Sequence, residues 1–386
     1  MFPQQTEFTH QERFLTFEPD HGGWNNIRLQ FEVAIVFAHS TNRTLVLPPK
    51  KHYYLLGPGL DVGSFYDIED LGRAMPVITA EEFLERMGLG DEYSEYDVYV
   101  DYCRKHGVNP KYVMYADVLA VPDIATCSST IPDDFPDFDL FAASNNKKEL
   151  SREEVDAQIL HIRTEGSEYR TFGLWYAFFY FSNPEWHRFY VGLIRKNFHY
   201  HDWLFDIGAE IVAKIVERHG LYNAVHIRRG DFQYTETRIP AEDMLRHTAP
   251  LLKSNGVKTL FVASDEKSDS FFDPFRQDFH VIRLGEFLKE VKVEKHYFGL
   301  LDQIICSAGE LFIGTELSTF SAHITRLRFN MDYEIAPDKE FYLTTRQYSG
   351  DRATDRWESS STWMNDGSPR WPHAVYFREF FDFLNV

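Results

Sequence analysis

The chain has 386 residues and a formal net charge of -19 at pH 7, and 44% of its residues are hydrophobic. This length exceeds the usual size of a single hydrophobic core, so two domains are expected. The acidic charge argues against nucleic acid or an anionic membrane as the main partner, because both bind basic surfaces. An anionic small ligand is compatible with this charge wherever arginines gather locally.

The three cysteines, Cys103, Cys127 and Cys306, lie far apart and form no Cys/His cluster. Their spacing predicts no zinc site and at most one disulfide. The N-terminus lacks a signal-peptide pattern, and no uncharged apolar run is long enough to span a bilayer. We therefore expect a soluble chain without a membrane segment, or a lumenal fragment whose anchor has been removed.

The first elements in the chain form a predicted βαβ unit. Residues 13–18 (RFLTFE) predict a short strand, the turn at 19–23 (PDHGG) leads into a helix that begins near Asn25, and residues 43–47 (RTLVL) predict the next strand. Glycines at a helix N-terminus let backbone N–H groups approach a phosphate or a sugar. A tight turn that needs the freedom of glycine is the alternative. The GxGxxG and P-loop patterns are absent, so neither a dinucleotide site nor a P-loop is predicted.

The middle of the chain is less regular. Residues 50–150 mix short apolar runs with Pro, Gly, Asp and Tyr and predict no clear order of elements. Asp137 and Asp139 have the DxD spacing that can hold a divalent cation, but we interpret them as solvated loop acids because no strand precedes them. The aromatic run at 173–198 is interrupted before Pro184, which predicts a buried segment followed by a helix.

Strand and helix patterns alternate in the second half. Helices are predicted at about 203–219, 240–254, 295–306 and 318–327, and strands at 259–263, 281–284 and 311–313. This alternation is typical of a parallel sheet with helices on both faces, so this part is predicted to be Rossmann-like. We expect residues 1–215 to form the first domain, and residues 216–386, which include the tail, to form the second.

The densest chemical signal is the stretch 222–232 (YNAVHIRRGDF), an apolar strand that ends in His226, Arg228, Arg229 and Asp231. These side chains are expected at or just past the C-terminal end of the strand, where open α/β sheets bind ligands. The planar forks of two adjacent arginines suit a diphosphate. A surface arginine pair that forms salt bridges to nearby acids is the alternative.

Two further segments can converge with this strand end. Residues 314–321 place Ser318 and Thr319 at a strand-to-helix junction, where hydroxyl and backbone N–H groups can bind phosphate. Ser318 as a plain N-cap is the alternative. Asp302, on the preceding helix, can accept hydrogen bonds from a ribose or a base, or it is a solvated helix acid.

Three segments together resemble the GDP-fucose fucosyltransferase superfamily, most closely its protein O-fucosyltransferase-like branch. They are GGWNNIRLQFEVAIVFAHSTNRTLVLPP, HIRRGDF, which matches the HxRR motif, and FIGTELSTFSAHITRLR. The resemblance covers about residues 13–330, and the ordered set is more specific than any one motif. The related α1,2 and α1,6 fucosyltransferases share HxRR, so the first and third segments decide the branch.

The resemblance implies a GT-B-like α/β architecture, with two Rossmann-like domains that face a central cleft. It also implies metal-independent, inverting transfer of fucose from GDP-fucose, with no cofactor. By matching positions, Arg228 holds the diphosphate and stabilises the leaving GDP, and Arg229 supports the site. The residues implied to contact the guanosine or to cradle the phosphate and base are His226, Asp302, Ser318, Thr319 and Phe320.

Residues of the first segment are implied to lie across the cleft. Asn26 and Arg28 would lie near the fucose and the acceptor, with Gly23 on the donor side and Trp24 on the acceptor side. Some relatives carry a glutamate in this glycine turn as the catalytic base, but here the turn reads HGGW over residues 21–24.

The catalytic base must then come from elsewhere. Glu236, which follows HxRR at a distance comparable to an acid implicated in α1,6 relatives, or Asp231 can deprotonate an acceptor hydroxyl. Each can instead be a counter-ion to Arg228 or Arg229, and for Asp231 this role is favoured.

Three functions remain open at this stage. The first is fucosyl transfer to a protein Ser or Thr or to a glycan. The others are a rhamnosyltransferase or other deoxysugar transferase of the same fold, and a catalytically inactive sugar-nucleotide-binding protein. The relatives imply the lumen of the ER or Golgi, with the cytoplasm as the alternative.

Overall fold

The structure is a computed structural model that describes residues 12–19, 22–90, 93–109, 152–163, 184–232, 238–315, 318–333 and 345–348. The chain divides into two compact units between His199 and Tyr200. The boundary expected at residue 215 falls inside α8 (Asp202–His219), which belongs to the second unit. The DxD pair, Cys127 and Glu236 lie outside the described residues.

The first unit contains a four-stranded sheet in the order β5-β2-β1-β6, with all neighbours parallel. Its strands are β1 (Phe14–Phe17), β2 (Thr44–Leu47), β5 (Val77–Thr79) and β6 (Ile159–Ile162). Helix α1 (Trp24–Ser40) connects β1 to β2, so the predicted βαβ unit is confirmed.

The remaining elements of the first unit lie between residues 51 and 197, and most of them fall in the part of the chain in which the sequence predicted no clear order. They are β3 (Lys51–Tyr53), β4 (Gly57–Leu60), a 3-10 turn (Val62–Ser64), α2 (Ile68–Ala74), α3 (Ala80–Arg86), α4 (Tyr96–His106), α6 (Arg152–Asp156) and α7 (Pro184–Asn197). Helix α3 starts at a capping box, in which Thr79 and Glu82 each bond the other's backbone N–H. The start of α7 at Pro184 is as predicted.

The second unit contains a five-stranded parallel sheet in the order β11-β10-β7-β8-β9. Its strands are β7 (Tyr222–Ile227), β8 (Thr259–Ser264), β9 (His280–Ile282), β10 (Phe312–Thr315) and β11 (Thr345–Tyr348). Counted from β7 along the chain, this is the strand order 3-2-1-4-5 of Rossmann-like folds. The predicted α/β class with two Rossmann-like units is confirmed.

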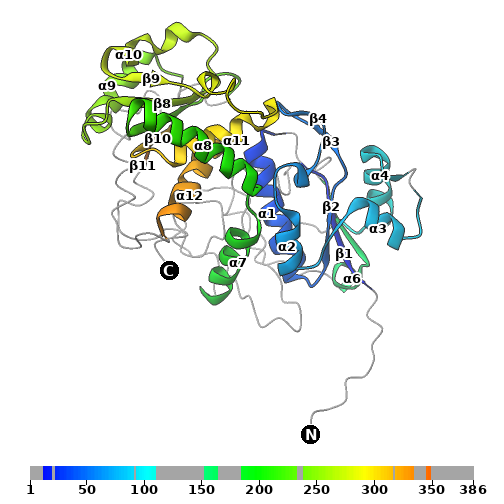
Figure 1. The fold of residues 1–386 in the computed structure, drawn as a ribbon. Coiled ribbons are helices and arrows are strands. Elements are labelled where there is room, and N and C mark those ends of the chain that lie inside the picture. Colours follow the sequence, from blue (N-terminus) through cyan, green and yellow to red (C-terminus); the bar gives the residue numbers. More distant parts are fainter. Residues whose placement is uncertain are drawn as a thin grey trace. The chain divides into compact units, whose positions relative to one another are not determined.

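Helices cover both faces of this sheet (Figure 1). They are α8, α9 (Ala241–Leu252), α10 (Asp273–Asp278), α11 (Phe298–Ser307) and α12 (Thr319–Tyr333). Short 3-10 turns span Asp269–Phe272, Leu284–Glu286 and Lys295–Tyr297. Val225 and Ile227 of β7 pack with Met244 of α9 in one buried cluster. Because side chains alternate along a strand, His226 faces the other side of the sheet.

Several predicted element boundaries in this unit differ from the structure, and α12 ends at Tyr333 rather than near residue 327. Residue 284 was expected to end a strand, but β9 ends at Ile282 because the Glu286 carboxylate accepts the backbone N–H of Arg283 and opens a 3-10 turn. Helix α11 begins at Phe298 rather than near Lys295, which lies in the preceding 3-10 turn. Strand β11, in the polar tail, was not predicted.

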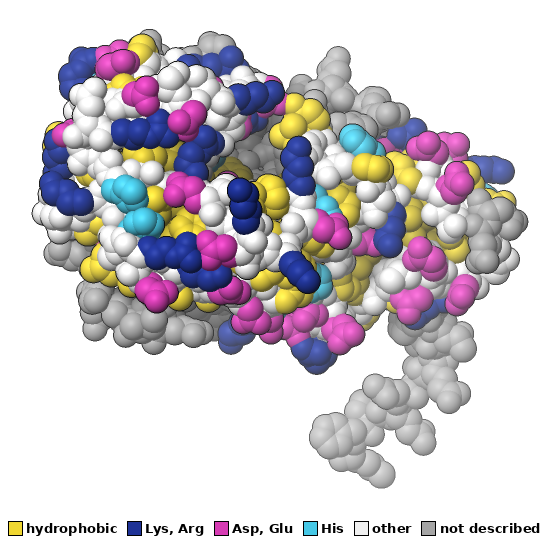
Figure 2. All heavy atoms as spheres, turned by 45° about the horizontal axis from the view of Figure 1, so that its top comes forward, with side chains coloured by type: hydrophobic (Ala, Val, Ile, Leu, Met, Phe, Trp, Pro, Cys, Tyr) yellow, Lys and Arg dark blue, Asp and Glu magenta, His cyan; other side chains and the backbone are white. Residues whose placement is uncertain are grey.

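The described residues include no helix that is both long and apolar enough to cross a membrane. Basic and acidic side chains are interspersed over the face shown in Figure 2, so this face carries no continuous basic surface of the kind that binds nucleic acid. Cys103 and Cys306 are buried and free.

Candidate functional site

The strand order of the second unit fixes where a ligand site is expected. Strands β7 and β10 are neighbours, but they leave the sheet toward connections on opposite sides, which makes their C-terminal ends the topological switch point. HIRRGDF begins with the last two residues of β7, and residues 315–321 begin with the last residue of β10. The sequence signals at the ends of these two strands are therefore brought together.

His226 is buried at the end of β7 and held by residues of α12. Its Nδ1 lies 2.7 Å from the Ser321 hydroxyl, and its ring stacks on Phe320 with centroids 4.4 Å apart. Burial, and secondarily the charge of Arg228, lowers the pKa of His226 to about 3. The imidazole is therefore neutral at physiological pH and offers a polar edge without a charge.

Thr315 and Ser321 join the two strand ends. The Thr315 hydroxyl donates to the carbonyl of His226 at 2.9 Å and accepts the backbone N–H of Arg228 at 3.0 Å. The backbone N–H of Thr315 donates to the Ser321 hydroxyl at 2.9 Å. A Cβ at Gly314 would lie 2.6 Å from the Ser321 Cβ, so the close approach of β10 to α12 requires glycine there.

Arg228 is held between two carboxylates. Its guanidinium forms ion pairs with Asp231, three residues on, and with Asp265, which follows β8. The arginine side chain is 21% exposed, and its guanidinium carbon lies 5.6 Å from the centre of the Phe232 ring. Burial, and secondarily the charge of Arg238, lowers the pKa of Arg228 from its ordinary value. The structure is compatible with both interpretations of this stretch. Arg228 forms salt bridges to nearby acids, and it also lies at the switch point, where a diphosphate can bind.

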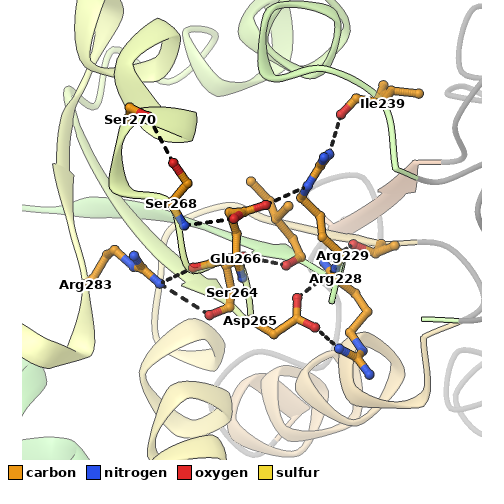
Figure 3. A network of polar contacts seen from close by, with 11 residues as sticks. Arg228, Arg229, Ile239, Ser264, Asp265, Glu266, Ser268, Ser270 and Arg283 are labelled. Carbon is orange, nitrogen blue, oxygen red and sulfur yellow. Dashed lines mark hydrogen bonds and ion pairs between the residues drawn. The ribbon is translucent and has the colours of Figure 1, made fainter. Parts of the chain in front are cut away.

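Arg229 points away from Arg228, toward Ile239 (Figure 3). Its guanidinium donates to the Ile239 carbonyl at 2.6 Å, pairs with Glu266 at 3.0 Å, and lies 4.3 Å from the centre of the Phe271 ring. These contacts tie the end of β7 to the turn after β8. Arg229 therefore supports the loop, which fits the supporting role that the resemblance implies.

Asp302 of α11 carries a carboxyl oxygen that lacks a partner in the described structure. Its Oδ1 is inaccessible to solvent and makes no hydrogen bond, although the residue as a whole is partly exposed. Burial raises the pKa of Asp302 to about 7, and Arg283 opposes this shift. A buried acceptor without a partner calls for an explanation, and a bound ligand that donates hydrogen bonds supplies one.

The next residue, Gln303, connects α11 to the third segment. Its amide donates to the carbonyl of Phe320 at 3.3 Å and accepts the hydroxyl of Tyr200 at 2.8 Å. Ser318 is buried immediately before α12, and Thr319 is the first helical residue. Gln303 thus links α11, the helix that carries Asp302, to Phe320, whose ring stacks on His226.

The candidate residues of the first unit lie in or beside the first turn of α1. The Gly23 carbonyl accepts the backbone N–H groups of Asn26 and Ile27, at 2.9 and 3.2 Å. Trp24 is buried with its ring 4.0 Å from that of Phe65, and the buried side chain of Arg28 forms an ion pair within α1. Roles of Gly23, Trp24, Asn26 and Arg28 toward donor or acceptor stay predictions.

The corresponding switch point of the first unit, between β1 and β6, is filled by its own side chains. Arg104 binds both carboxylate oxygens of Glu18, at 2.6 and 2.7 Å, and His161 lies 3.1 Å from Glu18. The other ring nitrogen of His161 lies 2.8 Å from the Thr16 hydroxyl. This mutually satisfied set leaves the charged groups at the end of β7 as the stronger ligand site.

Sequence reasoning missed Asp265 and Ser321 as parts of the site. Asp265 directly follows a predicted strand, as HIRRGDF does, and this position was the signal that could have identified it. Of the candidate bases, Asp231 is paired to Arg228 and Glu236 lies outside the described residues. Within the described ranges, no three His, Cys, Asp or Glu side chains are grouped so that they could hold a metal ion.

Comparisons with known proteins give three findings. The family model described as GDP-fucose protein O-fucosyltransferase matches residues 14–330. GDP-fucose protein O-fucosyltransferase 2 of Homo sapiens and that of Pan troglodytes are each 31% identical over 108 residues, which span 27% of this chain and 25% of those proteins.

Among solved structures, POFUT1 in complex with GDP-fucose is 17% identical with a TM-score of 0.45, and the match covers 83% of this chain and 96% of that one. The fucosyltransferase NodZ from Bradyrhizobium is 17% identical with a TM-score of 0.45, and the match covers 82% of this chain and 93% of that one.

Proposed function

Because the chain belongs to the GDP-fucose protein O-fucosyltransferase family, we propose that it is a glycosyltransferase that moves fucose from GDP-fucose to a hydroxyl group of an acceptor. The observation that carries the proposal is the set at the switch point of the second unit. A guanidinium, a neutral imidazole stacked on a phenyl ring, and a buried carboxyl oxygen without a partner belong to adjoining strand ends and helices.

Arg228 is the group proposed to bind the diphosphate. When fucose leaves, the bond between its anomeric carbon and the phosphate oxygen breaks, and negative charge collects on GDP. A planar guanidinium can donate two hydrogen bonds to phosphate oxygens and neutralises this charge without a metal. We therefore propose a metal-independent reaction, in which the fixed arginine supplies the electrostatic stabilisation.

Asp302 is proposed to select the base. Guanine presents two neighbouring donors, N1–H and the N2 amino group, and a carboxylate can accept from both. Adenine lacks this pair of donors, so it would leave the buried carboxyl oxygen without a partner, which costs about 1 to 3 kcal/mol. Phe320 and His226, stacked on each other, lie on the neighbouring elements. Ser318 and Thr319 are proposed to contact the donor beside them.

The transfer is proposed to invert the anomeric centre. In a single displacement, the acceptor oxygen forms its bond to the anomeric carbon as the bond to GDP breaks, and a base takes the acceptor proton. Asp231 is already the counter-ion of Arg228, which favours Glu236 for this role. The assignment of the base stays a prediction.

The family description names a protein acceptor, so a peptide Ser or Thr is the first acceptor to test, with a glycan as the alternative. A location in the lumen of the ER or Golgi is proposed on the same ground. Both proposals rest on the family to which the chain belongs.

The test is binding and turnover with purified protein. Isothermal titration with GDP, GDP-fucose, ADP and UDP-rhamnose should show binding of the two guanosine compounds only, and GDP-fucose should release GDP slowly in water. Arg228→Ala should abolish release. Arg276→Ala is the matched control, because Arg276 also pairs with two carboxylates but lies on α10. A wild-type protein that binds neither GDP nor GDP-fucose contradicts the proposal.

Binding of GDP without turnover of GDP-fucose against any peptide or glycan would instead indicate an inactive sugar-nucleotide-binding protein. Preference for UDP-rhamnose would indicate a different deoxysugar transferase of the same fold.

A further inference from the structure

Asp265 lies directly beside the HxRR motif, although the two are far apart in sequence. Strands β7 and β8 are parallel neighbours, and Ile227 is in register with Ser264. The residues that follow each strand, Arg228 and Asp265, therefore leave the sheet side by side at its C-terminal edge.

The Asp265 carboxylate binds both a backbone N–H group and a side chain of the HxRR motif (Figure 3). Its Oδ1 accepts the backbone N–H of Arg229 at 2.7 Å, and its Oδ2 pairs with the guanidinium of Arg228. The carboxylate thus fixes the backbone just past β7 and the direction of the Arg228 side chain together.

The residues on both sides of Asp265 form hydrogen bonds that hold its turn in place. The Ser264 hydroxyl donates to the Ile227 carbonyl at 2.7 Å and accepts the N–H of Glu266 at 3.0 Å. The Glu266 carboxylate accepts the N–H of Ser268 at 2.8 Å and pairs with Arg229. A carboxylate on a turn with these contacts has little freedom to leave its partner.

Gly230 leaves the space that the Asp265 carboxylate occupies. A Cβ at this position would lie 2.3 Å from the Asp265 Oδ2 and 3.2 Å from a guanidinium nitrogen of Arg228. The backbone of Gly230 is not in the left-handed region. A side chain at residue 230 would therefore displace the Asp265 carboxylate from its position on Arg228.

Two carboxylates occupy the guanidinium of Arg228, so Asp231 and Asp265 both compete with a diphosphate for its N–H donors. One carboxylate must give way when the donor binds. The side chain of Asp231 is 43% exposed, against 30% for Asp265. An exposed pair is worth at most about 1 kcal/mol, so Asp231 is the one that exchanges cheaply.

We propose that Asp265 is a positioning residue, which stays on Arg228 and aims its guanidinium while the diphosphate takes the place of Asp231. The inference rests on the proposed function, because it assumes that Arg228 binds the donor diphosphate. Asp265 does not touch the reacting atoms, and its effect passes through Arg228.

The test compares Asp265→Asn, Gly230→Ala and Asp231→Asn by GDP titration and by GDP release from GDP-fucose in water. Asp265→Asn keeps an oxygen for the Arg229 N–H but loses the ion pair, so kcat should fall about tenfold or more with a smaller change in KM. Gly230→Ala keeps every charge and should reproduce this loss. Asp231→Asn should bind GDP up to about fivefold more tightly. Asp269→Asn, which removes an exposed carboxylate paired to Arg276, is the matched control.

The outcomes separate the two claims. A wild-type protein that does not bind GDP or use GDP-fucose defeats the proposed function itself. If wild type is active and Asp265→Asn behaves like Asp231→Asn, with tighter GDP binding and unreduced kcat, then Asp265 is only a competing counter-ion and the inference is overturned. Should Asp265→Asn fail to fold, full kcat in Gly230→Ala overturns it equally.

Discussion

The hydroxyl of Ser321 lies 2.7 Å from Nδ1 of His226 across a sequence separation of 95 residues. The same hydroxyl accepts the backbone N–H of Thr315, and the Thr315 hydroxyl in turn bridges His226 and Arg228. Two hydroxyl groups therefore hold β7, β10 and α12 in one arrangement at the switch point. The position of the arginine depends on residues that need not touch the ligand.

Replacing Ser321 by alanine should weaken the donor site. The change leaves the buried Nδ1 of His226 and the N–H of Thr315 without this partner, which costs about 1 to 3 kcal/mol of stability. We expect GDP affinity to fall about tenfold, a loss of about 1.4 kcal/mol, as measured by titration calorimetry. Ser307→Ala, which removes a hydroxyl that donates to the Ile304 carbonyl within α11, is the control. Equal GDP affinity in wild type and Ser321→Ala would show that this hydroxyl does not position the site.

Asp302 should make GDP binding depend on pH. Its pKa is raised to about 7 by burial, and the ionised form is the one that can accept both guanine donors. Affinity should therefore rise as pH rises from 6 to 8, by about tenfold if binding requires the carboxylate. The phosphate of GDP also titrates near pH 6, so Asp302→Asn is measured in parallel. The Asp302-dependent part is the difference between the two curves, and parallel curves would rule out this role.

The same pKa shift predicts an effect on stability. Native Asp302 keeps its proton to a higher pH than the unfolded chain does, so the native state binds more protons between about pH 4 and 7. The contribution of Asp302 to stability is then greatest at low pH and declines as pH rises through this window. Bound GDP should offset the decline, which a pH series of thermal unfolding with and without GDP can measure.

The sequence predicted which strand ends carry the chemistry because apolar runs and their charged termini are local features. It did not predict that β8 lies beside β7, since strand order in a parallel sheet depends on long-range pairing. The pairing of Asp265 with Arg228 therefore could not be predicted from the sequence. Likewise, helical periodicity could not show that one carboxyl oxygen of Asp302 is inaccessible to solvent, because this depends on how α11 packs in the folded unit.

Helix α1 shows a second limit of pattern reading. Ile27, Phe31 and Ile35 recur at the spacing of a single buried helix face, yet α1 is buried nearly all round, with Arg28 and Glu32 included. The two charges lie one turn apart and form an ion pair inside the unit. An i,i+4 pair of opposite charge is usually a sign of solvent exposure, so the burial of these two residues could not be expected from their spacing.

Glu18 lies at the switch point of the first unit, between β1 and β6, which is filled by the unit's own side chains. Burial raises the pKa of Glu18, but hydrogen bonds from Arg104 and His161 outweigh burial and hold it well below its ordinary value. A depressed carboxyl pKa stabilises the native state above the unfolded pKa, and this stability is lost as pH falls toward the native pKa. Glu18→Gln should cost about 2 kcal/mol at pH 7, as for a hydrogen bond to a charged group, and this cost should shrink as pH is lowered from 5 to 3. Urea unfolding measured across this pH range gives both quantities.

Glu12→Gln removes the exposed pair with Arg86 in the same unit and should cost at most about 1 kcal/mol. Equal losses for the two variants would show that the network of Glu18, Arg104 and His161 does not stabilise the first unit more than a surface ion pair does.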